Sequence, residues 1–425
     1  MARLEPIGIT VIFHRNTLMA CVGDAIVIYE NSYPRRADPQ DPHASLYDVD
    51  NASTVITLGD WYHKKAPAMQ AQYLAQVTDE PVPDTGLING VGRYEGGPNV
   101  PWPRINVESG KRYRFRIINI SAYAGFEFSI EKHDLKIIEV DGINHVPKTV
   151  KALEVFAVDE ENVFGVLHYD GASNSNPTTR NDDFPGDGDF LKEHELVPLE
   201  NPGAPGGSGP ADRVIDLSFT RTTIGGEEAW TINGIRYHAP TLPTLLNILG
   251  GATVASDFTP AESTYVLQRN QVIELVIHGS ANGLWLLTPC APLPVSTCFP
   301  NLSDIFFHSP DLYSLHGHPF DVIQGMSGSA NYVNPPRRDV VGVKVALSAK
   351  LQVALSSSDS PRTTPDLGQF DPFLHCHLDW HLEAGLAVVF AEAPAEQRTG
   401  SQSQIIKPSW EALCPIYNAL PAALQ

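Results

Sequence analysis

The chain has 425 residues, and at about 150 residues per domain this length predicts two or three domains. Charged residues make up only 18%, whereas Pro and Gly number 35 and 33, so the composition favours an all-β protein with many turns. The formal net charge of −20 argues against binding to nucleic acid or to an anionic membrane surface, because both would repel the protein.

The sequence shows no targeting segment of an obvious kind. No apolar run reaches the roughly 18 to 20 residues that a membrane span needs. The N-terminal residues lack the continuous apolar core of a secretion signal. We therefore expect no membrane partner, and no signal peptide is visible in this chain.

Short runs of β-branched and aromatic residues, separated by turn residues, predict many short strands. In chain order these runs are 25–29, 54–58, 113–118, 136–140, 214–219, 272–277 and 387–391. The run from Tyr113 to Ile118 alternates apolar and polar residues, which is typical of a half-buried strand. Such a pattern indicates β-sandwiches or β-barrels.

Turn-rich stretches divide the chain. The segment 201–210 is rich in Pro and Gly and lacks apolar periodicity, so it predicts a domain boundary near residue 200. A weaker boundary lies near Asp50 to Ser53. The predicted divisions are 1–52, 53–200 and 201–425. The stretch 284–310 is apolar, interrupted by Pro and aperiodic, and resembles neither a strand nor a linker.

The densest cluster of metal-binding residue types is His375-Cys376-His377, followed by His381. Side chains alternate between the two faces of a strand, so Cys376 should point away from His375 and His377. His381 can reach the Cys376 side if the strand turns into a helical loop. A thiolate with imidazoles is typical of a blue copper site, and the two outward histidines could serve a second copper centre. The same ligand types also suit zinc, which the triplet alone does not exclude.

The longer segment from Phe373 to Glu392 resembles the C-terminal copper signature of basidiomycete laccases, almost residue for residue. Further segments resemble the same multicopper oxidase family. They are 41–50, 59–63, 87–94, 110–119, 231–234 and 334–341. The resemblance extends over most of the chain.

This resemblance implies three cupredoxin-like Greek-key β-barrel domains. Residues 1–52 would be a remnant of the first domain, 53–200 a partly deleted second domain, and 201–425 the third domain with the copper motif. An intact family member carries four coppers, one of type 1 and three in a type 2/type 3 cluster. It oxidises phenols or aromatic amines by single electrons, reduces oxygen to water, and is a secreted glycoprotein associated with lignin degradation.

Site residues follow from the same resemblance. Cys376 and His381 would bind type 1 copper, and Leu386 would stand at its non-coordinating axial position, where it raises the reduction potential relative to Met. The implied type 3 ligands are His316, His375 and His377.

Two carboxylates also match family positions. Asp379 would assist proton delivery to reduced oxygen, although it could also be an Asp that caps a loop. Asp141 would accept a proton from a phenolic substrate, although by itself it is a turn Asp before Gly142.

The chain departs from the family at several ligand positions. The two His-rich motifs of the first domain are absent, and the third motif carries Asp311 and Ser314 in place of histidines. Three histidines on this chain alone would not complete the cluster. The alternative to a laccase is therefore a catalytically inactive laccase-like protein or an incomplete gene product. We hypothesise that residues 1–24 and about 283–314 derive from an incorrect start and from translated non-coding sequence.

Overall fold

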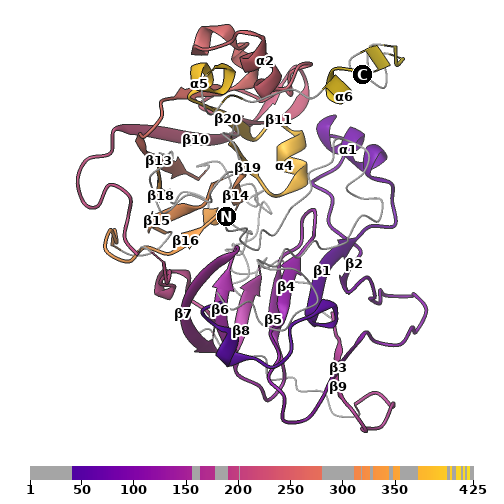
Figure 1. Cartoon of the computed structure of the whole chain (residues 1–425). Coiled ribbons are helices and arrows are strands. Elements are labelled where there is room, and N and C mark those ends of the chain that lie inside the picture. The colour runs from indigo at the N-terminus through magenta and orange to yellow at the C-terminus, as the bar shows by residue number, and fades with distance from the viewer. Residues whose placement is uncertain are drawn as a thin grey trace, which may run out of the picture.

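The computed structural model describes most of the chain between residues 41 and 421 and confirms an all-β protein with a few short helices (Figure 1). The described ranges are 41–155, 163–177, 190–200, 202–279, 311–316, 318–325, 329–343, 348–354, 372–399, 403, 408–412, 415–416 and 419–421. Of the segments 1–24 and about 283–314, for which we hypothesised an origin outside the protein-coding sequence, residues 1–24 and 283–310 lie outside these ranges, whereas 311–314 belong to β14. Within them, no helix has the length and apolarity needed to cross a membrane.

The N-terminal body contains one small sheet and three strand pairs. The sheet has the order β2-β1-β4, with β1 (Val55–Trp61) in the centre, β2 (Thr85–Ile88) and β4 (Arg116–Asn119). The pairs are β3 (Arg104–Val107) with β9 (Val166–Tyr169), β5 (Phe126–Ser129) with β8 (Ala152–Val155), and β6 (Leu135–Val140) with β7 (Ile143–Val150). Ile56 and Leu58 of β1 pack with Ile88 and Phe126 in the core of this body.

The C-terminal body consists of two larger sheets. One has the order β11-β10-β13-β18-β15-β16 and the other the order β12-β20-β19-β14-β17. The bounds of the first are β10 (Arg213–Ile224), β11 (Glu227–Ile232), β13 (Val272–His278), β15 (Phe320–Gln324), β16 (Arg337–Arg338) and β18 (Ser348–Ala354). Those of the second are β12 (Thr264–Leu267), β14 (Asp311–His316), β17 (Val340–Val343), β19 (Phe373–Cys376) and β20 (Ala387–Glu392).

Alternating apolar residues explain how these two sheets pack. In β10, Ile215, Leu217 and Phe219 are buried, whereas the residues between them face outward. They share one core with Leu374 of β19 and Phe390 of β20. The two sheets therefore bury a common apolar layer. The strands predicted at 54–58, 136–140, 214–219, 272–277 and 387–391 are all confirmed.

Helices are short and lie at the ends or edges of the sheets. The α-helices are α1 (Ala66–Leu74), α2 (Thr244–Gly250), α4 (Asp379–Glu383), α5 (Pro394–Arg398) and α6 (Pro408–Glu411). Single 3-10 turns occur at η1 (Ala44–Leu46), η2 (Ala52–Thr54), η4 (Glu193–Glu195), η5 (Ala255–Asp257) and η6 (Pro260–Glu262). Although α1 precedes the predicted boundary, its Met69 and Tyr73 belong to the core of the C-terminal body. Figure 1 accordingly shows α1 beside α4.

The boundary predicted near residue 200 separates the strand pairings but not the side-chain contacts. Every strand pairing among the described residues lies on one side of it. Contacts such as Tyr73 with Trp230 and Asp141 with Arg338 cross it. The two bodies are therefore firmly joined, and the domain limits stay a prediction.

The strand predicted at Tyr113 to Ile118 is shorter than expected, because β4 begins at Arg116. Arg114 is buried and lies 2.7 Å from Asp41 and 3.9 Å from Asp50, and it also pairs with Glu139. Arginine can point inward here because carboxylates surround its guanidinium. The expectation of an inward apolar face and an outward polar face was wrong at this position.

We predict that Arg114→Met lowers the free energy of unfolding by about 3–5 kcal/mol, because it leaves buried carboxylates without their cation. Urea denaturation followed by tryptophan fluorescence measures this change. Arg112→Met is the matched control, since Arg112 pairs with Asp48 at the surface. It should shift the denaturation midpoint much less. Equal shifts for the two variants would contradict the role of the buried network.

Candidate metal centre

Strand β19 carries the predicted ligands in the middle of the five-stranded sheet. It pairs antiparallel with β14 on one edge, with His375 opposite Ser314, and with β20 on the other, with His375 opposite Ala387. Two neighbours therefore fix its register. With that register, successive side chains of β19 point to opposite faces of the sheet.

The structure brings Cys376 and His381 together. Cys376 Sγ lies 3.4 Å from Nδ1 of His381, and both residues are buried. His381 reaches the thiol because the chain leaves β19 after Cys376 and forms α4, as the sequence predicted for a strand that turns into a helical loop. The indole of Trp230 covers the imidazole of His381, with ring centroids 4.2 Å apart. Both donors are therefore buried, Cys376 within the apolar core and His381 beneath the indole of Trp230.

A Schellman motif closes α4 and returns the chain to Cys376. The amide of Gly385 donates to the carbonyl of Leu382, and the amide of Leu386 donates to that of His381. Gly385 adopts a φ of +110°, which favours glycine. The carbonyl of Leu386 then accepts a hydrogen bond from the amide of Cys376 at 3.2 Å. Leu386 is fully buried in the same core cluster as Cys376, and its axial role stays a prediction.

His375 and His377 lie on the other side of β19. Their rings are stacked, with centroids 5.8 Å apart and an interplanar angle of 26°. Nδ1 of His375 donates to the carbonyl of Cys376 at 2.7 Å, which leaves Nε2 as the nitrogen able to bind a metal. Burial lowers the pKa of His377 and favours its neutral, ligating form.

His316 is placed only through its backbone. It pairs with Phe373, and Ser314 pairs with His375, in the register of β14 with β19. The side chains of Asp311, Ser314 and His316 lie outside the described part of the structure. Within the described part, no group of three or more His, Cys, Asp or Glu residues is arranged to hold a metal ion. The structure thus assembles two pairs, Cys376 with His381 and His375 with His377.

Asp379 begins α4 between the ligand positions 377 and 381. Its amide donates to the carbonyl of Ala122, which joins α4 to the N-terminal body. Burial raises the pKa of Asp379 to about 8, and the charges of Asp60 and Glu383 add to this shift. Asp60 itself is partly buried and accepts hydrogen bonds from three consecutive amides, 122 to 124. The charge of Asp60 therefore acts on Asp379 where the two bodies join.

Asp141 is held in a tight turn rather than left free. Asp141 and Gly142 have φ values of +52° and +75° and form the two-residue hairpin between β6 and β7. Its carboxylate accepts hydrogen bonds from Arg338 at 2.8 and 3.4 Å and from the amide of Asp339 at 3.3 Å. The interpretation as a turn residue is thus correct for the backbone. The role in accepting a substrate proton stays a prediction.

Sequence reasoning missed Glu80, which lies 3.0 Å from Nε2 of His381. Glu80 belongs to the Pro-containing segment between α1 and β2, where no motif or periodicity distinguishes it. Trp230 was missed for the same reason, since a tryptophan in a buried strand looks like any core residue. Only the docking of α1 and β11 around α4 brings these residues to the site.

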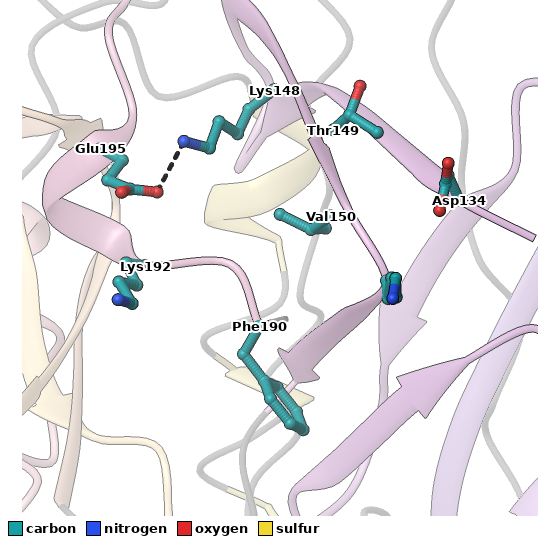
Figure 2. A pocket seen from close by; sticks show the side chains of 8 residues that line it. Asp134, Lys148, Thr149, Val150, Phe190, Lys192 and Glu195 are labelled. Atoms are coloured by element: carbon teal, nitrogen blue, oxygen red, sulfur yellow. Dashed lines mark ion pairs between the residues drawn. The ribbon is translucent and has the colours of Figure 1, made fainter. Parts of the chain in front are cut away.

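A separate surface cavity of about 320 Å³ lies beside β7 in the N-terminal body (Figure 2). Phe190 lines it together with side chains of both charges, and Lys148 pairs with Glu195 at 2.8 Å. None of the predicted ligands lines this cavity. It contributes nothing to the metal centre.

Comparisons with known proteins agree with this geometry. Two family models, both described as multicopper oxidase, match residues 52–164 and 237–396. Laccase-2 of Pleurotus ostreatus is 39% identical over 415 residues, covering 90% of this chain and 68% of the relative. The chain belongs to the multicopper oxidase family, among the fungal laccases. The prediction made from Phe373 to Glu392 is confirmed.

Other relatives of this laccase-type chain give the same result. Laccase-4 of Thanatephorus cucumeris is 42% identical, covering 83% of this chain and 66% of the relative. The laccase structure from Botrytis aclada matches with a TM-score of 0.63 at 23% identity, over 86% of this chain and 68% of that one, and supports the cupredoxin-like fold. The chain spans about two thirds of the length of the curated relatives.

Copper is the metal that this family implies for the laccase-type chain. The donors on one face of β19 fit it, because a thiolate and an imidazole nitrogen 3.4 Å apart can bind one ion and the buried surroundings exclude water. The pair on the other face fits less completely. His375 and His377 supply two imidazoles there, and the side chain of the third predicted ligand, His316, lies outside the described part of the structure.

We predict that Gly385→Ala lowers the free energy of unfolding by about 1–3 kcal/mol through backbone strain. A Cβ at this position would also lie 2.4 Å from Cγ of Arg236 and 3.1 Å from the carbonyl oxygen of Trp230. Chemical denaturation measures the loss. Gly250→Ala is the control, since a Cβ there meets nothing within 4 Å at the end of α2. A neutral Gly385→Ala would show that the turn is not constrained as described.

Proposed function

We propose that this chain acts as a laccase-type oxidase, taking single electrons from phenols or aromatic amines and passing them to oxygen, which is reduced to water. The observation that carries the proposal is the contact of Cys376 Sγ with Nδ1 of His381 in the buried core. Copper bound there would supply a one-electron acceptor. Family membership supports the same activity. Because fungal laccases are typically secreted, we also propose that this protein acts outside the cell.

The proposed division of ligands follows the two faces of β19. Cys376 and His381 would hold type 1 copper, and His316, His375 and His377 would hold type 3 copper. The covalent backbone between Cys376 and its neighbouring histidines would connect the two centres. The opposite placement of the two described pairs supports this arrangement.

Two carboxylates complete the proposal. Asp379 would deliver protons to the cluster side, which its partly buried position between residues 377 and 381 supports. Asp141 would accept a proton from a phenolic substrate. For this, its carboxylate would have to contact the substrate while it also binds Arg338. In both cases the chain holds or moves a proton at a carboxylate oxygen.

We predict that the protein titrated with Cu(II) develops the intense blue absorption of a thiolate bound to copper, and that Cys376→Ser abolishes it. His377→Gln is the contrasting variant. It should keep the blue absorption, because residue 377, directly after β19, pairs with His375 and not with Cys376, but lose copper content and oxygen uptake with a phenol. Absorption spectra, metal analysis and an oxygen electrode give the three readouts.

Two outcomes would contradict parts of this proposal. A wild-type protein that binds no copper would exclude the electron-transfer centre. A blue protein that takes up no oxygen would support the alternative of an inactive laccase-like protein.

A further inference from the structure

Glu80 contacts the edge of His381 that faces away from Cys376. The distance from Oε1 of Glu80 to Nε2 of His381 is 3.0 Å, and the two side chains are 23% and 7% exposed. Oε1 is buried, and no described group, His381 included, makes a hydrogen bond of regular geometry to it. The 3.0 Å contact makes the His381 imidazole an ion-pair partner of this buried oxygen.

The two nitrogens of His381 consequently face different groups. Nδ1 lies 3.4 Å from Cys376 Sγ, and Nε2 faces the carboxylate. A neutral imidazole carries one proton, and the hydrogen bond made by one nitrogen determines which nitrogen can bind a metal. If Nε2 carries the proton toward Glu80, the lone pair of Nδ1 is directed to the thiol side. The indole of Trp230, with its ring centroid 4.2 Å from that of the imidazole, restricts rotation of the His381 ring.

The segment that carries Glu80 is held at both ends. Before it, α1 inserts Tyr73 into the C-terminal core, and Gln70 of α1 donates to Glu383 of α4. After it, the amide of Asp84 donates to the carbonyl of Trp61 at 2.8 Å. The contact between Glu80 and His381 therefore depends on the docking of the two bodies and not on a loose surface side chain.

We propose that Glu80 is a positioning residue for the metal centre, which holds His381 with its proton on Nε2 so that Nδ1 faces the metal. This inference rests on the proposed copper function, since it concerns the same site. The negative charge of Glu80 stabilises the more positive oxidised state of a metal bound at Nδ1, and so lowers its reduction potential. Its effect on the potential is opposite to that of the apolar Leu386.

The test compares Glu80→Ala with Asp79→Ala in the full chain. Asp79 is the neighbouring exposed residue, and its replacement removes the same charge. Titration with Co(II), followed by the thiolate charge-transfer absorption, reports metal affinity. We expect Glu80→Ala to weaken binding about 10- to 100-fold and to raise the reduction potential of copper bound in its place, and Asp79→Ala to change neither strongly.

A conservative variant separates position from charge. Glu80→Gln keeps an oxygen that can accept the Nε2 proton, so it should restore most of the affinity while the potential stays raised. Nitrogen-15 NMR of His381 in the metal-free protein gives a readout independent of metal. It should show the proton on Nε2 in the wild type, and a mixture of tautomers in Glu80→Ala.

The outcomes distinguish this inference from the function on which it rests. A wild-type protein that binds neither Co(II) nor Cu(II) overturns the proposed function, while the NMR result still tests Glu80. Wild-type affinity and tautomer in Glu80→Ala would overturn the positioning role alone. Equal effects of Glu80→Ala and Asp79→Ala would also overturn it, because they would reflect general charge rather than contact.

Discussion

The register of β19 between β14 and β20 is the constraint on which the rest of the metal centre depends. Hydrogen bonds on both edges place Cys376 opposite Tyr313 and His375 opposite Ser314. A slip by one residue would exchange the faces of Cys376 and its neighbouring histidines. It would also move Cys376 away from α4 and from His381. One short strand can therefore serve two centres only because its pairing is specified from both sides.

The second requirement is the return of the chain after β19. A helix of one turn, closed at Gly385, brings His381 back to the thiol and places Leu386 beside Cys376. The local sequence contains both the residues that form this helix and the glycine that ends it. Contacts with β11 hold this helix in place. Trp230 of β11 covers the imidazole of His381, and the amide of Trp230 donates to the carbonyl of Ala384.

The two bodies contribute unequally to this centre. The predicted copper ligands come from the C-terminal body, whereas the outer edge of His381 is covered by Glu80 of the N-terminal body. Helix α1 makes this possible, because Met69 and Tyr73 pack into the C-terminal core. Partly buried ion pairs reinforce the arrangement, with Arg338 bound to both Asp141 and Glu193. Removing the partner of such a charge costs far more than removing an exposed pair.

By itself, the sequence determined the family, the all-β class and the face on which each residue of the motif from His375 to His377 lies, because strand periodicity and the run of ligands are local properties. It also predicted the strands at 54–58, 136–140, 214–219, 272–277 and 387–391. It failed at Arg114, where pattern alone cannot show the carboxylates that neutralise a buried guanidinium. Only the tertiary structure showed Glu80 and Trp230 at His381, because their contacts join residues far apart in the chain and no local pattern records them.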